Sequence, residues 1–224
     1  MSSRSDSNQI TRDYFDSILL ETRYWDSDLP STKMELYGET FETPIMTAAL
    51  SHLHEICDNA MAEFGKGAKD AGAVHWVGMG EDDELEQILA TGARTVKIIK
   101  PHREDEVIYH KIRHAAEHGA FAVGMDIDHC FAGNGEYDVV CGLPMHAKTA
   151  SDLENYVKAS SVPFIVKGVL SAKDAEKCVK AGVSGILVSH HHGIMQYAVP
   201  PLMILPEIVK AVAVSYTHLT LPTK

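Results

Sequence analysis

The chain has 224 residues, 45% of them hydrophobic, which is enough for one substantial core. Its formal net charge of −11 would repel phosphate backbones and anionic lipid headgroups, so neither nucleic acid nor a membrane is expected as a partner. The sequence shows no signal peptide, no bilayer-spanning run and no CxxC motif, which favours a cytoplasmic protein without a zinc knuckle or a disulfide framework.

The sequence begins with a polar segment and then alternates between strand and helix patterns. Residues 1–7 are polar and predict disorder, and residues 10–20 predict a short helix. Short apolar runs then predict six strands, at residues 43–49, 73–78, 94–99, 121–128, 162–169 and 185–189. Helical patterns occupy residues 54–71, 82–91, 104–119, 150–159, 171–182 and 201–212.

Residues 162–189 form the clearest structural unit. The first run is rich in β-branched residues and too short for a helix, Ser171 is a suitable helix N-cap, and Gly182 suits the left-handed conformation that ends many helices. A second apolar run follows at residues 185–189. This β-α-β order predicts a parallel strand pair joined by a right-handed crossover.

Reactive side chains follow most of the predicted strands at their C-terminal ends. These residues are Lys97, Lys100, Asp126, Asp128, Lys167, Ser189 and His191. A barrel gathers such groups around one mouth, whereas a doubly wound sheet usually has a glycine-rich phosphate loop after its first strand, and residues 43–49 are followed by none. The pattern therefore favours an α/β fold, a (β/α)8 TIM barrel that is incomplete, with about six of its eight units present.

The chain divides into three regions on these patterns. Residues 1–42 form an N-terminal segment that leads into the barrel, and residues 43–212 form the partial barrel. Residues 213–224 break the helical pattern before them, and their composition is that of a foreign or misread tail. We expect a truncated reading frame to explain both the missing strands and this tail.

Two strands and the helix between them resemble a known family. Residues 163–168 read Pro-Phe-Ile-Val-Lys-Gly, residues 171–175 read Ser-Ala-Lys-Asp-Ala, and residues 185–191 read Gly-Ile-Leu-Val-Ser-His-His. These segments are similar to the FMN-dependent α-hydroxy-acid dehydrogenases and oxidases, the group of glycolate oxidase and lactate oxidase. The resemblance extends more weakly over residues 14–212.

The resemblance implies FMN as cofactor and a function for each matching residue. Lys167 matches the lysine beside the flavin N1 and C2 carbonyl, and Ser189 matches a flavin-contacting hydroxyl. His191 matches the base that removes the substrate's proton while a hydride equivalent passes to the flavin, and Asp128 matches the carboxylate that orients this base. The implied substrate is a small α-hydroxy acid, such as lactate or glycolate, or a related alcohol.

Further flavin contacts are implied by the same alignment. They fall at Ala48, Ala49, Gly78, Lys97 and Asp126. Three of these positions depart from the family, which has a serine at Gly78, a glutamine at Lys97 and a threonine at Asp126. The resemblance also implies a possible homo-tetramer for the full-length parent.

The usual recognition of a substrate carboxylate is altered. Two family arginines, whose guanidinium groups can clamp a carboxylate, fall at Ile194 and Gly135, and a family tyrosine falls at Ile99. Candidate replacements are His190, His192, His129, Lys97 and Lys100. Substrate specificity is therefore expected to differ from that of the family.

Other interpretations of the histidine triplet at residues 190–192 remain open. One catalytic histidine with two solvated neighbours is the simplest, and no metal is expected. Together with Asp126, Asp128 and His129, however, two histidines could bind a divalent ion. A metal-dependent lyase or isomerase, a ligand-binding barrel and a non-catalytic interaction protein are the alternative functions.

Overall fold

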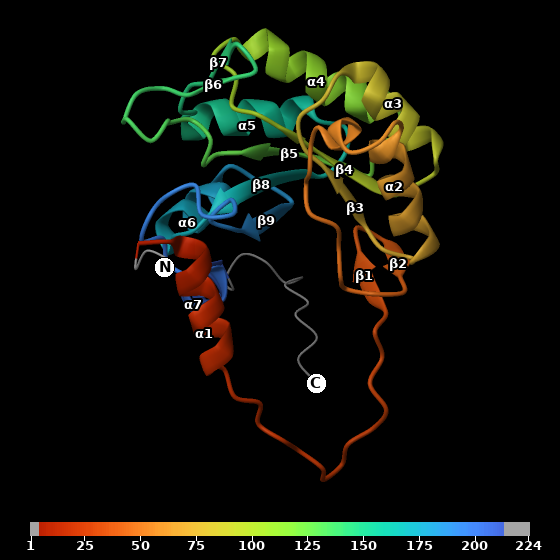
Figure 1. Cartoon of the computed structure of the whole chain (residues 1–224), viewed down its shortest axis with the longest axis vertical. Helices are drawn as coiled ribbons and strands as arrows, with labels where there is room; N and C mark the ends of the chain where they lie inside the picture. The colour runs from red at the N-terminus through yellow and green to blue at the C-terminus, as the bar shows by residue number, and fades with distance from the viewer. Residues whose placement is uncertain (1–4, 213–224) are drawn as a thin grey trace.

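The computed structural model describes residues 5–212, whose central feature is a curled parallel sheet. In this part of the chain the sheet has five strands in the order β3-β4-β5-β8-β9. Their bounds are His75–Val77 for β3, Thr95–Ile99 for β4, Ala122–Asp126 for β5, Phe164–Val169 for β8 and Gly185–Val188 for β9. Figure 1 shows this sheet with helices along its outer side, as an incomplete barrel requires.

The helices follow the strands in alternation. Their bounds are Ala60–Asp70 for α2, Asp82–Ala90 for α3, Asp105–Glu117 for α4, Ala150–Ala159 for α5, Ala172–Lys180 for α6 and Pro201–Val212 for α7. Successive helices pack side by side, from α2 to α7. The helix predicted at residues 54–71 is shorter than expected, because Asn59 adopts a left-handed φ of 60° and separates α2 from the short 3-10 helix η1 (Leu53–Glu55).

The predicted helix caps of the β8-α6-β9 unit are confirmed. Ser171 Oγ accepts the backbone N–H of Asp174 at 3.1 Å, which satisfies one of the free donors of the first turn of α6. Gly182 follows the helix with a φ of +78°, a conformation that costs glycine little. The local sequence therefore fixes both ends of α6.

The predicted first strand, residues 43–49, is wrong. This segment lies beside β3, but no strand is assigned to it: its backbone makes one bond toward the sheet, from the Thr47 N–H to the Val74 carbonyl at 3.2 Å, and an isolated bridge follows between Leu50 and Val77. Pro44 has no N–H to donate, and the side chain of Thr47 takes the place of ladder bonds by accepting from the Trp76 N–H at 2.8 Å. The described residues thus supply five strands to the parallel sheet rather than six.

An unpredicted hairpin closes the N-terminal end of the sheet. It consists of β1 (Met34–Leu36) and β2 (Glu39–Phe41), joined by Tyr37 and Gly38, which both have positive φ as a type I′ turn requires. Phe41 and Tyr37 pack against the ring of Phe121 at centroid distances of 5.5 and 5.6 Å. The inner face of the sheet is therefore sealed at this end by aromatic side chains.

The N-terminal residues are ordered from Ser5 onward. Ser7 begins α1 (Ser7–Ser17), is buried, and accepts the backbone N–H of Ala198 at 2.9 Å. The expected disorder of residues 1–7 is therefore wrong for residues 5–7, and residues 1–4 lie outside the described part of the chain. So does the predicted foreign tail, residues 213–224.

The two faces of the sheet bury different sets of side chains. The inner face carries Val74, Trp76, Val96, Ile98, Ala122 and Ile165. The outer face packs on the helices through Val77, Ile99, Val123, Met125 and Val166. This alternation follows from the strand period of two and decides which side chains can reach the barrel interior.

A second hairpin lies in the loop between β5 and α5. It is formed by β6 (Val139–Val140) and β7 (Leu143–Pro144), and its turn contains Cys141 and Gly142.

Among the helices of the described residues, none combines the length and apolarity that a bilayer crossing needs.

Candidate active site

Three residues predicted from the sequence converge at the C-terminal edge of the sheet. Lys167 is on β8, His191 is in the loop after β9, and Asp128 follows β5. The Lys167 Nζ lies 3.2 Å from His191 Nδ1, and Asp128 Oδ1 lies 2.9 Å from the same nitrogen. The two parallel strands thus place an ammonium group and an imidazole side by side.

The hydrogen bond to Asp128 assigns the protonation of the imidazole. A carboxylate only accepts, so His191 Nδ1 carries the proton and donates it to Asp128, which leaves Nε2 as the basic nitrogen. The second oxygen of Asp128 is buried and has no hydrogen-bond partner among the described residues. A buried carboxylate oxygen in this state suits a donor on a bound ligand or water.

The loop that carries His191 has an unusual backbone. His191 has a φ of +49°, which costs a residue with a β-carbon about 1 kcal/mol. Ser189 supports this turn, because its hydroxyl accepts the backbone N–H of His191 at 2.9 Å. Ser189, predicted as a flavin contact, therefore also holds the imidazole in position.

Asp128 in turn depends on a glycine in β8. Gly168 has a φ of +90°, and a β-carbon at this position would lie 2.4 Å from Asp128 Cγ. Only glycine combines this backbone conformation with the close approach of the carboxylate. The Lys-Gly pair of the sequence motif thus provides the Lys167 cation and, at Gly168, the space that Asp128 needs to reach His191.

Asp126 lies between two lysines and forms a buried three-residue cluster with them. Its Oδ1 accepts from Lys167 Nζ at 2.6 Å, and its Oδ2 accepts from Lys100 Nζ at 2.7 Å. Burial alone would raise the pKa of Asp126, but the charges of Lys100 and Lys167 lower it. The ionised triad carries a net charge of about +1. We call Lys100, Asp126 and Lys167 the charged triad.

Lys97, which the sequence predicted as a flavin contact, lies outside this cluster. Its Nζ donates to the Gly78 carbonyl at 2.6 Å, and burial, followed by the nearby charge of Lys111, lowers the pKa of Lys97 to about 8. Ile98 packs in the inner-face cluster, so strand alternation places Lys97 on the outer face.

Interior-facing and helix-facing side chains alternate along β4. The positions that face the interior are Ile98 and Lys100, whereas Ile99 belongs to the core on the helix side with Ile108. The sequence alignment had put a family tyrosine at Ile99, but in this structure Lys100 is the neighbouring side chain that faces the interior. The sequence placed Lys100 at the C-terminal edge and among the candidates for carboxylate binding, but it did not predict the contact with Asp126, because periodicity fixes alternation but not its phase.

The remaining predicted flavin contacts lie near the edge of β3. A β-carbon on Gly78 would come within 2.4 Å of Ser51 Oγ and 2.9 Å of the Ala49 carbonyl, so this glycine allows the segment that contains Ala48 to approach β3. Ala48 is exposed and Ala49 is half-buried. Their contact with a flavin stays a prediction.

The other two histidines of the triplet differ in their contacts. His190 Nε2 lies 2.8 Å from Thr11 Oγ1, and its Nδ1 accepts the Gly193 N–H at 2.9 Å. His192 offers its carbonyl to Asn8 Nδ2 at 2.9 Å. The expectation of two solvated neighbours is therefore wrong for His190, whose ring contacts α1, whereas the side chain of His192 is exposed.

The alternative metal site has its donor atoms close together but an unsuitable charge. One donor atom each from Asp126, Asp128 and His191 lies within 4.8 Å of the others. Both oxygens of Asp126, however, already accept from ammonium groups, and a divalent cation would be repelled by these charges. The arrangement favours an ion-paired site over a metal centre.

Comparison with known proteins decides the family. The sequence model of FMN-dependent dehydrogenases matches residues 2–151 and 143–219. The chain belongs to the FMN-dependent dehydrogenase family. This family is one of enzymes that use FMN, so the recognition, the enzyme class and the cofactor predicted from the sequence are confirmed at the level of the family.

Individual relatives are distant and longer than this chain. 4-Hydroxymandelate oxidase of Amycolatopsis orientalis is 23% identical over 217 residues, covering 82% of this chain and 61% of the relative. L-Lactate oxidase of Lactobacillus jensenii is 26% identical over 218 residues, covering 83% and 53%. The chain thus spans between about half and three fifths of the lengths of these family members.

Solved structures confirm the fold. The crystal structure of mandelate oxidase with 3,3-difluoro-2-hydroxy-3-phenylpropionic acid superposes with a TM-score of 0.83 at 23% identity, covering 95% of this chain and 67% of that one. A mandelate oxidase variant with a C4a-OH-FMN adduct gives a TM-score of 0.82. The half-barrel of this chain therefore has the fold of family members, as predicted.

The chemistry of the edge fits the family's cofactor. Reduction adds negative charge to a flavin ring, and the net positive charged triad is suited to stabilise it there. His191 lies beside this triad, at 3.2 Å from Lys167, so a base and a cation would flank the same bound molecule. Lys100 lies in the same cluster as Lys167, to which the resemblance alone assigned a positive charge beside the flavin.

Proposed function

We propose that the chain is the major part of an FMN-dependent oxidoreductase that oxidises a small α-hydroxy acid or a related alcohol. The observation that carries this proposal is the convergence of Lys167, Asp128 and His191 at one edge, with separations of 3.2 and 2.9 Å. When bound, FMN would accept the hydride equivalent that the substrate loses.

His191 acts as the base in this proposal. Its Nε2 takes the proton of the substrate hydroxyl, and Asp128 holds the ring and stabilises the imidazolium that results. The Lys167 ammonium, 3.2 Å from the ring, opposes this positive charge. Asp126 offsets the opposition, since its Oδ1 is 2.6 Å from Lys167 and 3.8 Å from His191 Nδ1.

The charged triad acts through electrostatics and would hold the flavin ring from the inner face of the barrel. Because Asp126 neutralises one lysine, the second lysine is needed to leave a net positive charge. Replacement of the family threonine by Asp126 is thus compensated by Lys100, and the two changes form a matched pair.

Carboxylate recognition would differ from a two-arginine clamp. Ile194 is 39% exposed and carries no charge, and Gly135 lies in an exposed turn. We propose that Lys100 attracts a substrate carboxylate as a point charge. An ammonium lacks the planar fork of guanidinium, so this attraction discriminates less sharply between acids and is compatible with alcohols.

Flavin binding tests this proposal directly. FMN added to the apoprotein should show a shifted visible spectrum and quenched fluorescence, and Lys167→Met should weaken binding, whereas the exposed-lysine control Lys177→Met should not. His191→Asn should keep the flavin but slow its anaerobic reduction by lactate, glycolate or mandelate by about 10²- to 10⁴-fold. Absence of any flavin uptake by the wild-type protein would end the proposal.

A further inference from the structure

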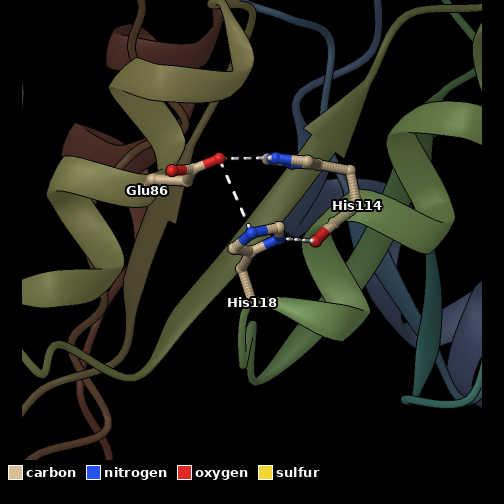
Figure 2. A group of neighbouring side chains, drawn as sticks. All are labelled: Glu86, His114 and His118. Carbon is tan, nitrogen blue, oxygen red and sulfur yellow. Dashed lines mark hydrogen bonds and ion pairs between the residues drawn. The ribbon is translucent and has the colours of Figure 1, made fainter.

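A second cluster of ionisable side chains lies where helices α3 and α4 meet. It shares no residue with the charged triad, Asp128 or His191. Glu86 is on α3, while His114 lies in the last turn of α4 and His118 is the C-cap residue of that helix. Figure 2 shows the carboxylate of Glu86 pointing toward both imidazole rings. Two histidines at positions i and i+4 face the same side of a helix, which is the spacing of many metal-binding pairs.

The three donor atoms lie at distances that suit a shared ion. Glu86 Oε1 is 3.0 Å from His114 Nε2 and 3.6 Å from His118 Nε2, and one donor atom from each residue lies within 4.8 Å of the others. Ligands of a tetrahedral zinc ion with bonds of about 2.1 Å are about 3.4 Å apart. Small side-chain rotations would therefore complete three corners of a tetrahedron.

The hydrogen bonds of His118 leave the correct nitrogen free. Its Nδ1 lies 2.8 Å from the backbone carbonyl of His114 and donates its proton there, as Figure 2 shows. The lone pair of Nε2 then faces Glu86, whose oxygen is also an electron-pair donor. Two such donors 3.6 Å apart are stabilised by a cation between them.

His114 has a buried nitrogen that metal binding would explain. Its Nδ1 is buried and lacks a hydrogen-bond partner among residues 5–212, but Asp82 Oδ1 lies 3.8 Å from it. A metal on Nε2 would move the ring proton to Nδ1, where it faces this carboxylate. Asp82 Oδ1 also accepts from Lys111 Nζ at 2.6 Å, and Asp82 Oδ2 lies 2.6 Å from His110 Nε2.

We propose that Glu86, His114 and His118 bind a divalent transition-metal ion of the zinc class and thereby join α3 to α4. Two imidazoles and one carboxylate favour Zn²⁺, Ni²⁺ or Cu²⁺ over Mg²⁺ and Ca²⁺, which prefer oxygen ligands. Three protein ligands leave the fourth position to water. The site is independent of flavin binding, because its ligands belong to neither the charged triad nor the His191 loop.

Calorimetric titration with ZnCl₂ tests the site on the whole 224-residue chain. Exposed Cys57 and Cys141 are first blocked with iodoacetamide, so that thiol-bound zinc is not counted. We expect the wild-type protein to bind one equivalent, and His118→Ala and Glu86→Gln each to weaken binding by about tenfold or more. His54→Ala is the matched control, since His54 faces Glu84 at 3.9 Å without a third ligand in the described residues.

A thermal measurement gives a second readout. Zinc should raise the melting temperature of the wild-type protein and the His54→Ala control, because the ion binds only the folded chain, and should raise that of Glu86→Gln by less at the same zinc concentration. Glu86 is half-exposed, so this variant should fold even if His118→Ala does not. Zinc affinity that is equal in Glu86→Gln and the wild-type protein, or absent from the wild-type protein, would overturn the proposal.

Discussion

The two ends of the sheet bury opposite kinds of side chain, aromatic at one end and charged at the other. At the N-terminal end, Phe121 packs between Phe41 and Tyr37, and the guanidinium of Arg94 lies 4.8 Å from its ring centroid. At the C-terminal edge, the buried side chains are instead Lys100, Asp126 and Lys167. One end therefore gains stability from buried apolar area, whereas the other retains buried charges that cost stability and that the proposed function uses.

This contrast agrees with the general division of labour in barrels. Residues below the strands serve the fold, and residues above them serve the site. Here the hairpin β1–β2 occupies the lower end, and the loops that carry Asp128 and His191 occupy the upper one. Substitutions at the two ends should accordingly affect different measurements.

The largest expected effect on stability is at the aromatic end. Phe121→Ala should lower the free energy of unfolding by about 4 kcal/mol, because it removes a buried ring and leaves a cavity. Urea denaturation measures this loss. Phe131→Ala is the control at the other end, where the ring is 51% exposed, and should cost less than about 1 kcal/mol. Equal losses of stability in the two variants would show that the aromatic contacts of Phe121 do not stabilise the fold more than the exposed ring of Phe131 does.

Removal of the buried Lys97 ammonium should raise the free energy of unfolding rather than lower it. Lys97→Met should stabilise the protein by about 2 kcal/mol at pH 7, since the shift in the pKa of Lys97 corresponds to about 3 kcal/mol and the lost bond to Gly78 offsets about 1. Chemical denaturation of both proteins measures the difference. The exposed Lys66→Met is the control and should change stability by less than about 0.5 kcal/mol.

The same variant has a defined pH dependence. The pKa of Lys97 is depressed to about 8 in the folded state from 10.5, so between these values the unfolded chain binds more protons. The wild-type protein should therefore gain stability relative to Lys97→Met as the pH rises from about 8 to 10.5. A difference between the two proteins that stays constant across this window would contradict the burial of an isolated charge.

The smallest effect concerns the glycine beneath Asp128. Gly168→Ala and Gly119→Ala place a β-carbon at similar φ values, +90° and +87°, but only at Gly168 does it meet another residue. Gly168→Ala should therefore cost about 1 kcal/mol more than Gly119→Ala in urea denaturation. It should also shift the NMR signals of the His191 ring, which Gly119→Ala leaves in place. Identical behaviour of both variants would mean that Asp128 can move freely.

Local sequence was sufficient for the units that repeat. The β8-α6-β9 unit, the cap at Ser171 and the meeting of Lys167 with His191 all follow from short patterns, since parallel strands deliver their C-terminal residues to one edge. The family also followed from these residues. Each of these features depends on contacts between neighbours in the chain or on a simple period.

Other features were decided only by the tertiary structure. A shift of one residue turns a strand side chain to the opposite face, and only the packing of β4 decided that Lys97 bonds to the Gly78 carbonyl while Lys100 bonds to Asp126. Residues 43–49 had a strand-like composition but bonded to β3 mainly through a threonine side chain. Two lysines and Asp126, distant in sequence, became a single charged group only because the folded sheet brought their strands together and excluded water from them.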